Sequence, residues 1–269
     1  MTSNNNNLEK ALSQGYDLDF GKVIEKSFEN FKKTWAMGGL AFIIIFLIIM
    51  ALLIGVALIG FGGAALSNLL NLESLENLEN FKMTDLSPVF LLGYMIMTAL
   101  FVGLGNIFYA GVYKMIDDAE TNKSFGIDSI FFYFRSNHFA QLFLAGIILG
   151  VLSTFLTFGF EYINYPILGA LTQYIINFFT FLTVPLIVFS NQNATSALAK
   201  SVQLVLKKPL IILGLLLVSF ILALIGFIAL CIGVIFTAFI IYIVIYHIYI
   251  SAVPHENNSD LDLIGASEE

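Results

Sequence analysis

The chain is organised around residues 23–54, which begin with Val23-Ile-Glu-Lys-Ser-Phe-Glu-Asn-Phe-Lys-Lys33 and continue, after Trp35, into the uncharged run Gly38–Gly62. The first segment is amphipathic and ends in two lysines. A helix needs about 20 apolar residues to cross the ~30 Å hydrocarbon core of a bilayer. The pattern therefore predicts a helix lying on the membrane surface, an elbow, and then a membrane-spanning helix.

The composition extends this interpretation to the whole chain. Of the 269 residues, 58% are hydrophobic and only 12% are charged, whereas soluble domains carry about 25% charged residues. The apolar residues come in long blocks without charge, and they do not alternate as the strands of a membrane barrel would. We expect an all-α, polytopic membrane protein with two or three interfacial elbow helices.

Six membrane-spanning helices are predicted. The run Pro209–Val253 has no charged residue, and its 45 residues would measure about 67 Å as one helix. Because that is twice the core thickness, it must turn, and Gly226 and Gly233 bracket the expected turn. The expected spans are 38–62, 88–115, 139–160, 166–189, 209–227 and 232–253. They form one domain, 17–253, between a disordered tail, 1–16, and an acidic tail, 254–269.

Two later segments, Ile127–Arg135 and Ala197–Lys208, are candidates for further elbows. Each contains a Ser, a bulky apolar residue four positions on and a base two further, as the first elbow does; the triplets are Ser27/Phe31/Lys33, Ser129/Tyr133/Arg135 and Ser201/Val205/Lys207. The match is consistent with a parallel internal repeat, but the need of any elbow for an apolar face and a terminal base accounts for it more simply. We expect the bases at the membrane surface to be Lys32, Lys33, Lys207 and Lys208. Between the first two spans, Ala64–Ser87 fits a second surface helix or a leucine-bearing loop.

The basic residues predict the orientation. Eleven of the twelve Lys and Arg residues lie on one side of the expected spans, and only Lys82 lies on the other. Cytoplasmic loops carry the excess of Lys and Arg, so both termini are expected in the cytoplasm. No cleavable signal peptide is evident in Met1–Asp19. The net charge of −7 argues against nucleic acid as a partner.

The spans lack the usual signs of chemistry. No Asp, Glu, Lys or Arg lies in the middle of an expected span, and such residues normally mark proton relays and charged sites. No spacing of metal ligands, catalytic nucleophile motif or phosphate loop is present, so we expect no catalytic residue, no metal and no cofactor. His247, near the inner end of the last span, fits an interfacial hydrogen-bonding residue better than a site.

A few polar side chains do lie at membrane depth. The amides Asn106, Gln173 and Asn177 are candidates for lining a cavity, although hydrogen bonding between helices is the commoner use. Pro185 predicts a kink near Phe181–Pro185, because proline leaves a carbonyl four residues back without its partner. Thr180 and Thr183 are expected to help satisfy the freed backbone.

Three segments resemble a known group: Tyr109-Ala-Gly-Val-Tyr-Lys-Met115 leading to Phe125–Phe134, Thr183-Val-Pro185 with Ala197–Lys208, and the paired spans that follow. The group consists of six-helix bacterial integral membrane proteins related to the membrane domain of some glycerophosphodiester phosphodiesterases. Its members often have a proline in the last span, whereas Phe236–Ile243 has none. The resemblance implies a six-helix bacterial membrane protein, and no activity, because the phosphodiesterase domain is absent.

The sequence thus favours a non-enzymatic structural or interaction protein of the bacterial cytoplasmic membrane, whose partners are membrane lipids and other envelope proteins. The alternative is a transporter or channel for an uncharged or lipid-like solute. A third reading is an enzyme that uses interfacial residues such as Glu161 or Asp117. A polar cavity lined by the three amides would favour transport, and a solid apolar bundle would favour the structural role.

Overall fold

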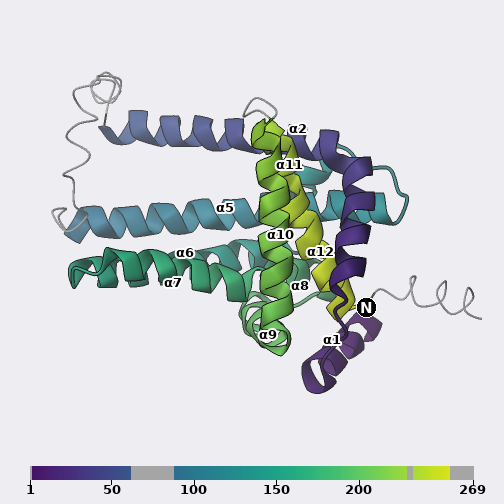
Figure 1. Cartoon of the computed structure of the whole chain (residues 1–269). Helices are drawn as coiled ribbons and strands as arrows, with labels where there is room; N and C mark the ends of the chain where they lie inside the picture. The colour runs from purple at the N-terminus through teal and green to yellow at the C-terminus, as the bar shows by residue number, and fades with distance from the viewer. Residues whose placement is uncertain (1, 62–87, 229–232, 255–269) are drawn as a thin grey trace, which may run out of the picture.

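The computed structural model describes residues 2–61, 88–228 and 233–254, and this part of the chain contains helices and no strand (Figure 1). In chain order the helices are α1 (Thr2–Gln14), α2 (Phe20–Phe61), α5 (Pro88–Glu120), the 3-10 helix η2 (Ile127–Arg135), α6 (Phe139–Tyr162), α7 (Pro166–Thr180), α8 (Thr183–Ser190), α9 (Ala194–Lys207), α10 (Pro209–Ile228), α11 (Gly233–Thr237) and α12 (Phe239–Ala252).

Six helical segments are long and apolar enough to cross a bilayer: Phe20–Val56, Leu91–Glu120, Phe139–Tyr162, Pro166–Ser190, Pro209–Phe227 and Gly233–Ala252. Their number confirms the prediction of an all-α polytopic fold with six membrane-spanning helices. The fold is therefore that of a multi-pass membrane protein.

Helix α2 contains the predicted elbow without a break in its hydrogen bonding. Its ribbon turns sharply between a first part and a long second part (Figure 1). Near this turn, Gly38 lies against the ring of Phe239 and Gly39 against the ring of Phe236. Any side chain at either glycine would collide with these rings, so the two glycines let α11 and α12 approach the bend closely.

The first part of α2 packs through a polar face. Ser27, Asn30 and Thr34 are buried there, whereas Phe28 and Trp35 on the other side are exposed. Phe28 therefore lies on the side that faces away from the rest of the protein, whereas the Trp35 ring packs edge-on against Phe236 of α11, with 5.9 Å between the ring centroids. Asp19 caps the start of the helix, because its Oδ1 accepts a hydrogen bond of 2.8 Å from the backbone N–H of Lys22.

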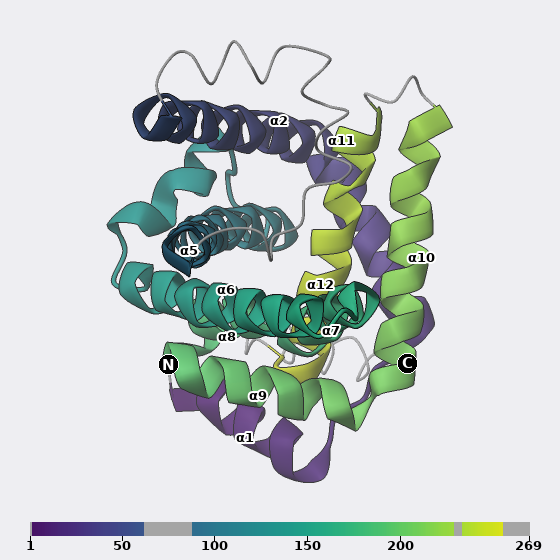
Figure 2. The ribbon, with the colours of Figure 1, turned by 90° about the vertical axis from the view of Figure 1, so that its left-hand side faces the viewer.

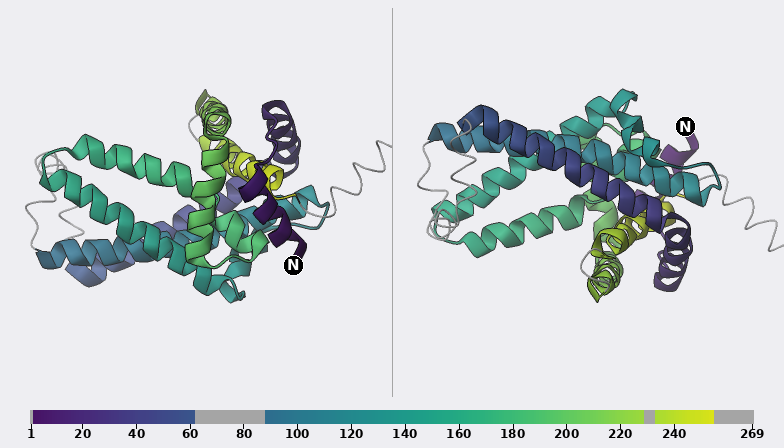
Figure 3. Two further views of the ribbon diagram at one scale, coloured as in Figure 1. Left: turned by 90° about the horizontal axis from the view of Figure 1, so that it is seen from below. Right: turned by 90° about the horizontal axis from the view of Figure 1, so that it is seen from above.

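Two sets of helices run crosswise. α5 and α6 are antiparallel neighbours, whose glycines Gly103 and Gly146 lie back to back, while α6 and α7 diverge from their short connection (Figure 3). α10 and α12 run across the direction of α5, α6 and α7 in Figure 1 and again in Figure 2. The six candidate spans therefore do not form a single parallel bundle.

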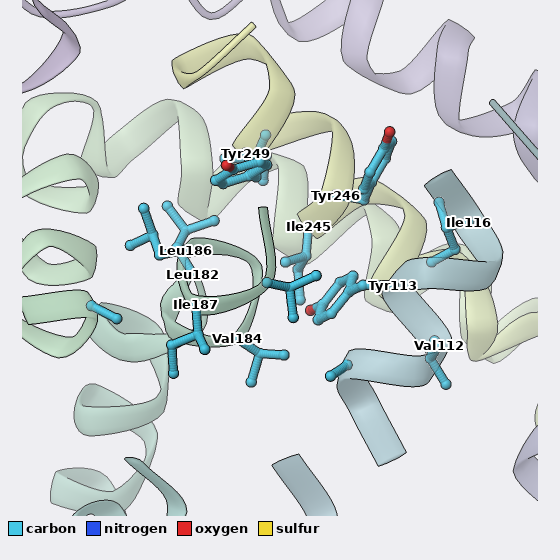
Figure 4. Close-up of a cluster of buried hydrophobic side chains, with 14 of the residues drawn as sticks. Val112, Tyr113, Ile116, Leu182, Val184, Leu186, Ile187, Ile245, Tyr246 and Tyr249 are labelled. Carbon is cyan, nitrogen blue, oxygen red and sulfur yellow. The ribbon is translucent and has the colours of Figure 1, made fainter. Parts of the chain in front are cut away.

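The main core lies where α5, α8 and α12 meet. Figure 4 shows Tyr113 of α5, Val184 of α8 and Ile245 of α12 lying toward one another within one buried cluster. Nearly all of α8 and most of α12 are buried. These two short helices therefore hold the crosswise sets together.

The expectation of a disordered tail over residues 1–16 is wrong, because Thr2–Gln14 forms α1 and its Leu8 and Ala11 are buried. The Asn4 side chain donates to the carbonyl of Phe189 at 3.0 Å, and that of Asn7 to the carbonyl of Pro254 at 3.0 Å. Asn4 and Asn7 thus hold α1 against later parts of the chain by hydrogen bonds, next to the buried Leu8 and Ala11. The expected surface helix or loop at Ala64–Ser87 and the acidic tail beyond Pro254 lie outside the described residues.

Candidate functional site

A cavity of about 610 Å³ lies among α5, α6, α7, α8 and α12, with Ile49 of α2 at its edge. Most of its lining is aliphatic or aromatic. The polar groups in the lining are the side chains of Asn106, Tyr109, Tyr113, Ser153, Gln173, Asn177, Thr180, Thr183 and Tyr242. None of the described residues that line it is charged.

The structure brings the three amides expected from the sequence together in this cavity. Asn106 comes from α5 and is 7% exposed, and Gln173 and Asn177 come from successive turns of α7. Their internal hydrogen bonds are long: Asn106 Nδ2 donates to the carbonyl of Leu142 at 3.4 Å, and Gln173 Nε2 donates to Asn177 Oδ1 at 3.4 Å. Since strong N–H···O bonds lie between about 2.7 and 3.2 Å, the amides keep hydrogen-bonding capacity for another molecule.

Two polar stripes face the cavity. Tyr109 and Tyr113 follow Asn106 on α5, and Thr180 follows Asn177 on α7, all at helical spacing. The amides were predicted from the sequence as lining residues, whereas the two tyrosines were not, and Thr180 was expected only to bond the backbone near Pro185. The spacings 106/109/113 and 173/177/180 were a usable signal, because each set falls on one face of its helix.

Thr183 provides a buried hydroxyl without a partner. Its side chain lines the cavity and is 1% exposed, and Oγ1 has no hydrogen-bond partner among the described residues. An unsatisfied buried hydroxyl costs about 1–3 kcal/mol. A bound molecule or water that reaches Oγ1 would remove that penalty.

The kink expected at Phe181–Pro185 is confirmed, because α7 ends at Thr180 and α8 begins at Thr183. The expected role of the two threonines is wrong. Thr180 Oγ1 donates to the carbonyl of Ile176 at 2.7 Å within its own helix. The backbone around the break is held instead by Ser201 of α9, which donates to the carbonyl of Phe179 at 2.8 Å and accepts from the N–H of Leu182 at 3.2 Å.

The polar residues near the C-terminal end of α5 form a separate cluster with residues of α2 and α12. Asp117 accepts a hydrogen bond of 2.7 Å from the Tyr246 hydroxyl, and Glu120 accepts one of 3.0 Å from the Asn30 amide. His247 is buried, and its Nε2 lies 4.0 Å from a Glu120 oxygen. Among the described residues, no three His, Cys, Asp or Glu side chains are grouped so that they can hold a metal.

Asp117 and Glu161, the two residues considered for an interfacial enzyme site, are not brought together. Asp117 lies near the C-terminal end of α5, and Glu161 near the C-terminal end of α6. Because α5 and α6 are antiparallel, these ends lie on opposite sides of the protein.

The elbow residues share one pattern of burial. Ser27, Ser129 and Ser201 are all buried, whereas the matching bases Lys33, Arg135 and Lys207 are exposed. Of the remaining predicted surface bases, Lys32 is exposed and Lys208 is half-buried. The exposed bases are therefore free to reach beyond the protein.

A second hollow, of about 710 Å³, is lined only by residues 128–136, with Asp128, Arg135 and the exposed rings of Phe131 and Phe132 among them. Since one short segment forms it, it is a surface recess and not a cavity between helices. Exposed rings beside charged groups are typical of a membrane–water interface.

No family model matches this chain, and neither a curated protein nor a solved structure was found to match it.

Proposed function

We propose that this chain is a non-enzymatic transporter or carrier that binds an uncharged solute in the cavity between α5, α7 and α12. One observation carries the proposal: Asn106, Gln173 and Asn177, from two different candidate spans, line one cavity together with several hydroxyls and no charged group. Polar side chains at membrane depth normally face the protein interior or a cavity, since lipid tails offer them no partner. A neutral hydrogen-bonding solute satisfies them without a counter-ion.

A purely structural or interaction role, which the sequence alone favours, explains the amides less well. Amides used to join helices would pair across the interface at short distance. Gln173 instead contacts Asn177 on its own helix at 3.4 Å, and Asn177 is exposed. A polar cavity favours transport, whereas a solid apolar bundle would have favoured a structural role. The cavity therefore supports transport.

Flux across vesicles tests the proposal. The full chain would be reconstituted into liposomes and compared with the triple variant Asn106→Leu, Gln173→Leu, Asn177→Leu for the passage of glycerol and the exchange of a fluorescent neutral lipid. The triple variant should lose the protein-dependent flux while it remains monodisperse. The matched control is Tyr174→Phe, which removes a hydroxyl from the outer face of α7. Equal flux for the triple variant and wild type across both solutes would refute the proposal.

The same proposal excludes proton coupling. The cavity lining holds no titratable carboxylate, amine or imidazole among the described residues. Uptake should therefore be unaffected by an imposed pH gradient. Uptake that follows the gradient would contradict this part of the proposal.

We also propose that the protein lies in the bacterial cytoplasmic membrane with both termini in the cytoplasm. The distribution of Lys and Arg supports this orientation, and the exposed Lys32, Lys33 and Lys207 are suited to anionic lipid headgroups. Labelling of single cysteines placed at Ser3 and Ser259 in intact cells tests it. Both positions should be protected from a membrane-impermeant reagent, and labelling from outside would reverse the orientation.

A further inference from the structure

We infer that the ligand of this cavity is a neutral lipid whose head carries hydroxyl or carbonyl groups and whose chains lie along the apolar part of the lining. The inference rests on the proposed function and narrows it, because it selects an amphiphile over a small water-soluble solute such as a polyol.

The size and lining of the cavity fit an amphiphile. Its volume of about 610 Å³ is in the range of pockets that hold ligands of drug size, roughly 300–1,000 Å³. Ile49, Phe101, Ile176 and Ile241 are among the apolar side chains that make up most of the surface. A small polyol would leave this apolar surface without contacts, whereas acyl or isoprenoid chains would cover it.

The polar stripes of the cavity lining have free hydrogen-bonding groups for a head. Thr183 Oγ1 is buried without a partner, and the amides of Gln173 and Asn177 make only one long bond to each other. With that bond made, the three side chains still offer four N–H or O–H donors and three acceptor oxygens to hydroxyl or ester groups. These are the groups that a glyceride or a long-chain alcohol presents.

The charge of the lining excludes a phosphate head. No described lining residue is Lys, Arg or His, and a buried anion without a cation or several strong donors is costly. Exposed bases such as Lys33, Arg135 and Lys207 lie elsewhere, on the elbows. Anionic phospholipids are therefore expected at the elbows and excluded from the cavity.

The position of α7 gives the lipid a route. Asn177 is exposed at the rim, on the helix whose Tyr174 is 72% exposed and faces outward. α6 and α7 diverge from their connection toward α8 and α12 (Figure 3). A lipid in the surrounding bilayer can reach the rim directly, whereas a solute from water would first have to cross the apolar surroundings.

Photolabelling tests the lipid class. The full chain, in phosphatidylcholine vesicles, would be irradiated with a diazirine analogue of diacylglycerol or with a diazirine phosphatidylglycerol that has the same chains, and labelled peptides would be mapped. We expect the diacylglycerol probe to label α5 and α7 peptides about ten-fold more in wild type and Tyr174→Phe than in the double variant Gln173→Leu, Asn177→Leu, from the loss of two hydrogen bonds. Thr183→Val should lower labelling about three-fold without lowering stability, because its hydroxyl has no internal partner to lose.

Three other outcomes of the labelling and flux experiments would overturn the inference. Equal labelling of the α5 and α7 peptides by both probes, or unchanged labelling in the double and Thr183 variants, would mean that the probes report only lipid around the protein. Glycerol flux that the triple amide variant abolishes, without cavity labelling by diacylglycerol, would refute the lipid class and leave the proposed transport function intact. Absence of both labelling and flux would refute both.

Discussion

The Tyr246 hydroxyl on α12 lies 2.7 Å from Oδ1 of Asp117 near the end of α5. One turn of α5 further on, Glu120 accepts a hydrogen bond from Asn30 of α2, whose amide also donates to the carbonyl of Ile116 at 3.1 Å. Hydrogen bonds at this polar cluster thus join α2, α5 and α12, which run in different directions. This explains why α5 continues to Glu120, beyond the expected end of its span at Met115.

Tyr246→Phe should destabilise the protein by about 1–2 kcal/mol, because it removes a hydrogen bond to a carboxylate that is only partly reached by solvent. Thermal unfolding of the purified protein in detergent would measure the loss. Tyr162→Phe, at an 80% exposed position, is the control and should leave the midpoint unchanged. If the two variants unfold alike, the Tyr246–Asp117 bond does not stabilise the fold.

The helices were predictable from the sequence because apolar length and the lack of charge determine what can cross a bilayer. The same physics located Asn106, Gln173 and Asn177, since an amide at membrane depth must face protein or a cavity. The direction of α10 and α12 was not predictable, because hydropathy and length carry no information on helix tilt. The free hydroxyl of Thr183 was equally hidden, because the sequence does not show that Ser201 of α9, and not Thr183, bonds the backbone at the helix break.

The N-terminal helix α1 could not be predicted from the sequence, for a different reason. A run of four asparagines looks like a solvated tail, and only the buried contacts of Leu8 and Ala11 with later helices order it. Tyr16, just after α1, strengthens this docking by donating to the carbonyl of Leu204 at 3.2 Å. Burial raises the pKa of Tyr16 to about 12, so the hydroxyl remains a donor at neutral pH.

Gly146→Ala should push α5 and α6 apart. A Cβ at this position would lie 2.5 Å from the Cα of Gly103, and backbone atoms of a packed helix cannot move aside locally. Such overpacking costs about 1–3 kcal/mol, measured as a lower unfolding midpoint. Gly159→Ala, on the same helix with nothing within 4 Å of its added Cβ, should instead stabilise by about 0.5–1 kcal/mol. Destabilisation of equal size in both variants would show that general helix effects, and not this contact, are responsible.

Ser201→Ala should weaken the junction between α7 and α8. The change leaves the carbonyl of Phe179 and the N–H of Leu182 without their side-chain partner in a buried place, at a cost of about 1–3 kcal/mol for an unsatisfied group. Hydrogen exchange at Leu182 should rise together with a fall in stability. Ser251→Ala removes only a bond to the carbonyl of His247 in the same helix and should have little effect. Unchanged exchange at Leu182 would mean that the kink is held by packing alone.

Leu8→Ala should release α1 from α8, α9 and α12. Leu8 is fully buried, and truncation of such a side chain costs about 2–5 kcal/mol. An isolated helix of 13 residues is marginal in water, so losing its main anchor should unfold it locally and speed amide exchange over residues 2–14 by about thirty-fold or more. Glu9→Ala is the control: it removes the 2.6 Å ion pair with Lys200, and exposed pairs contribute about 0–1 kcal/mol. If Glu9→Ala releases the helix and Leu8→Ala does not, electrostatic contacts and not apolar burial dock α1.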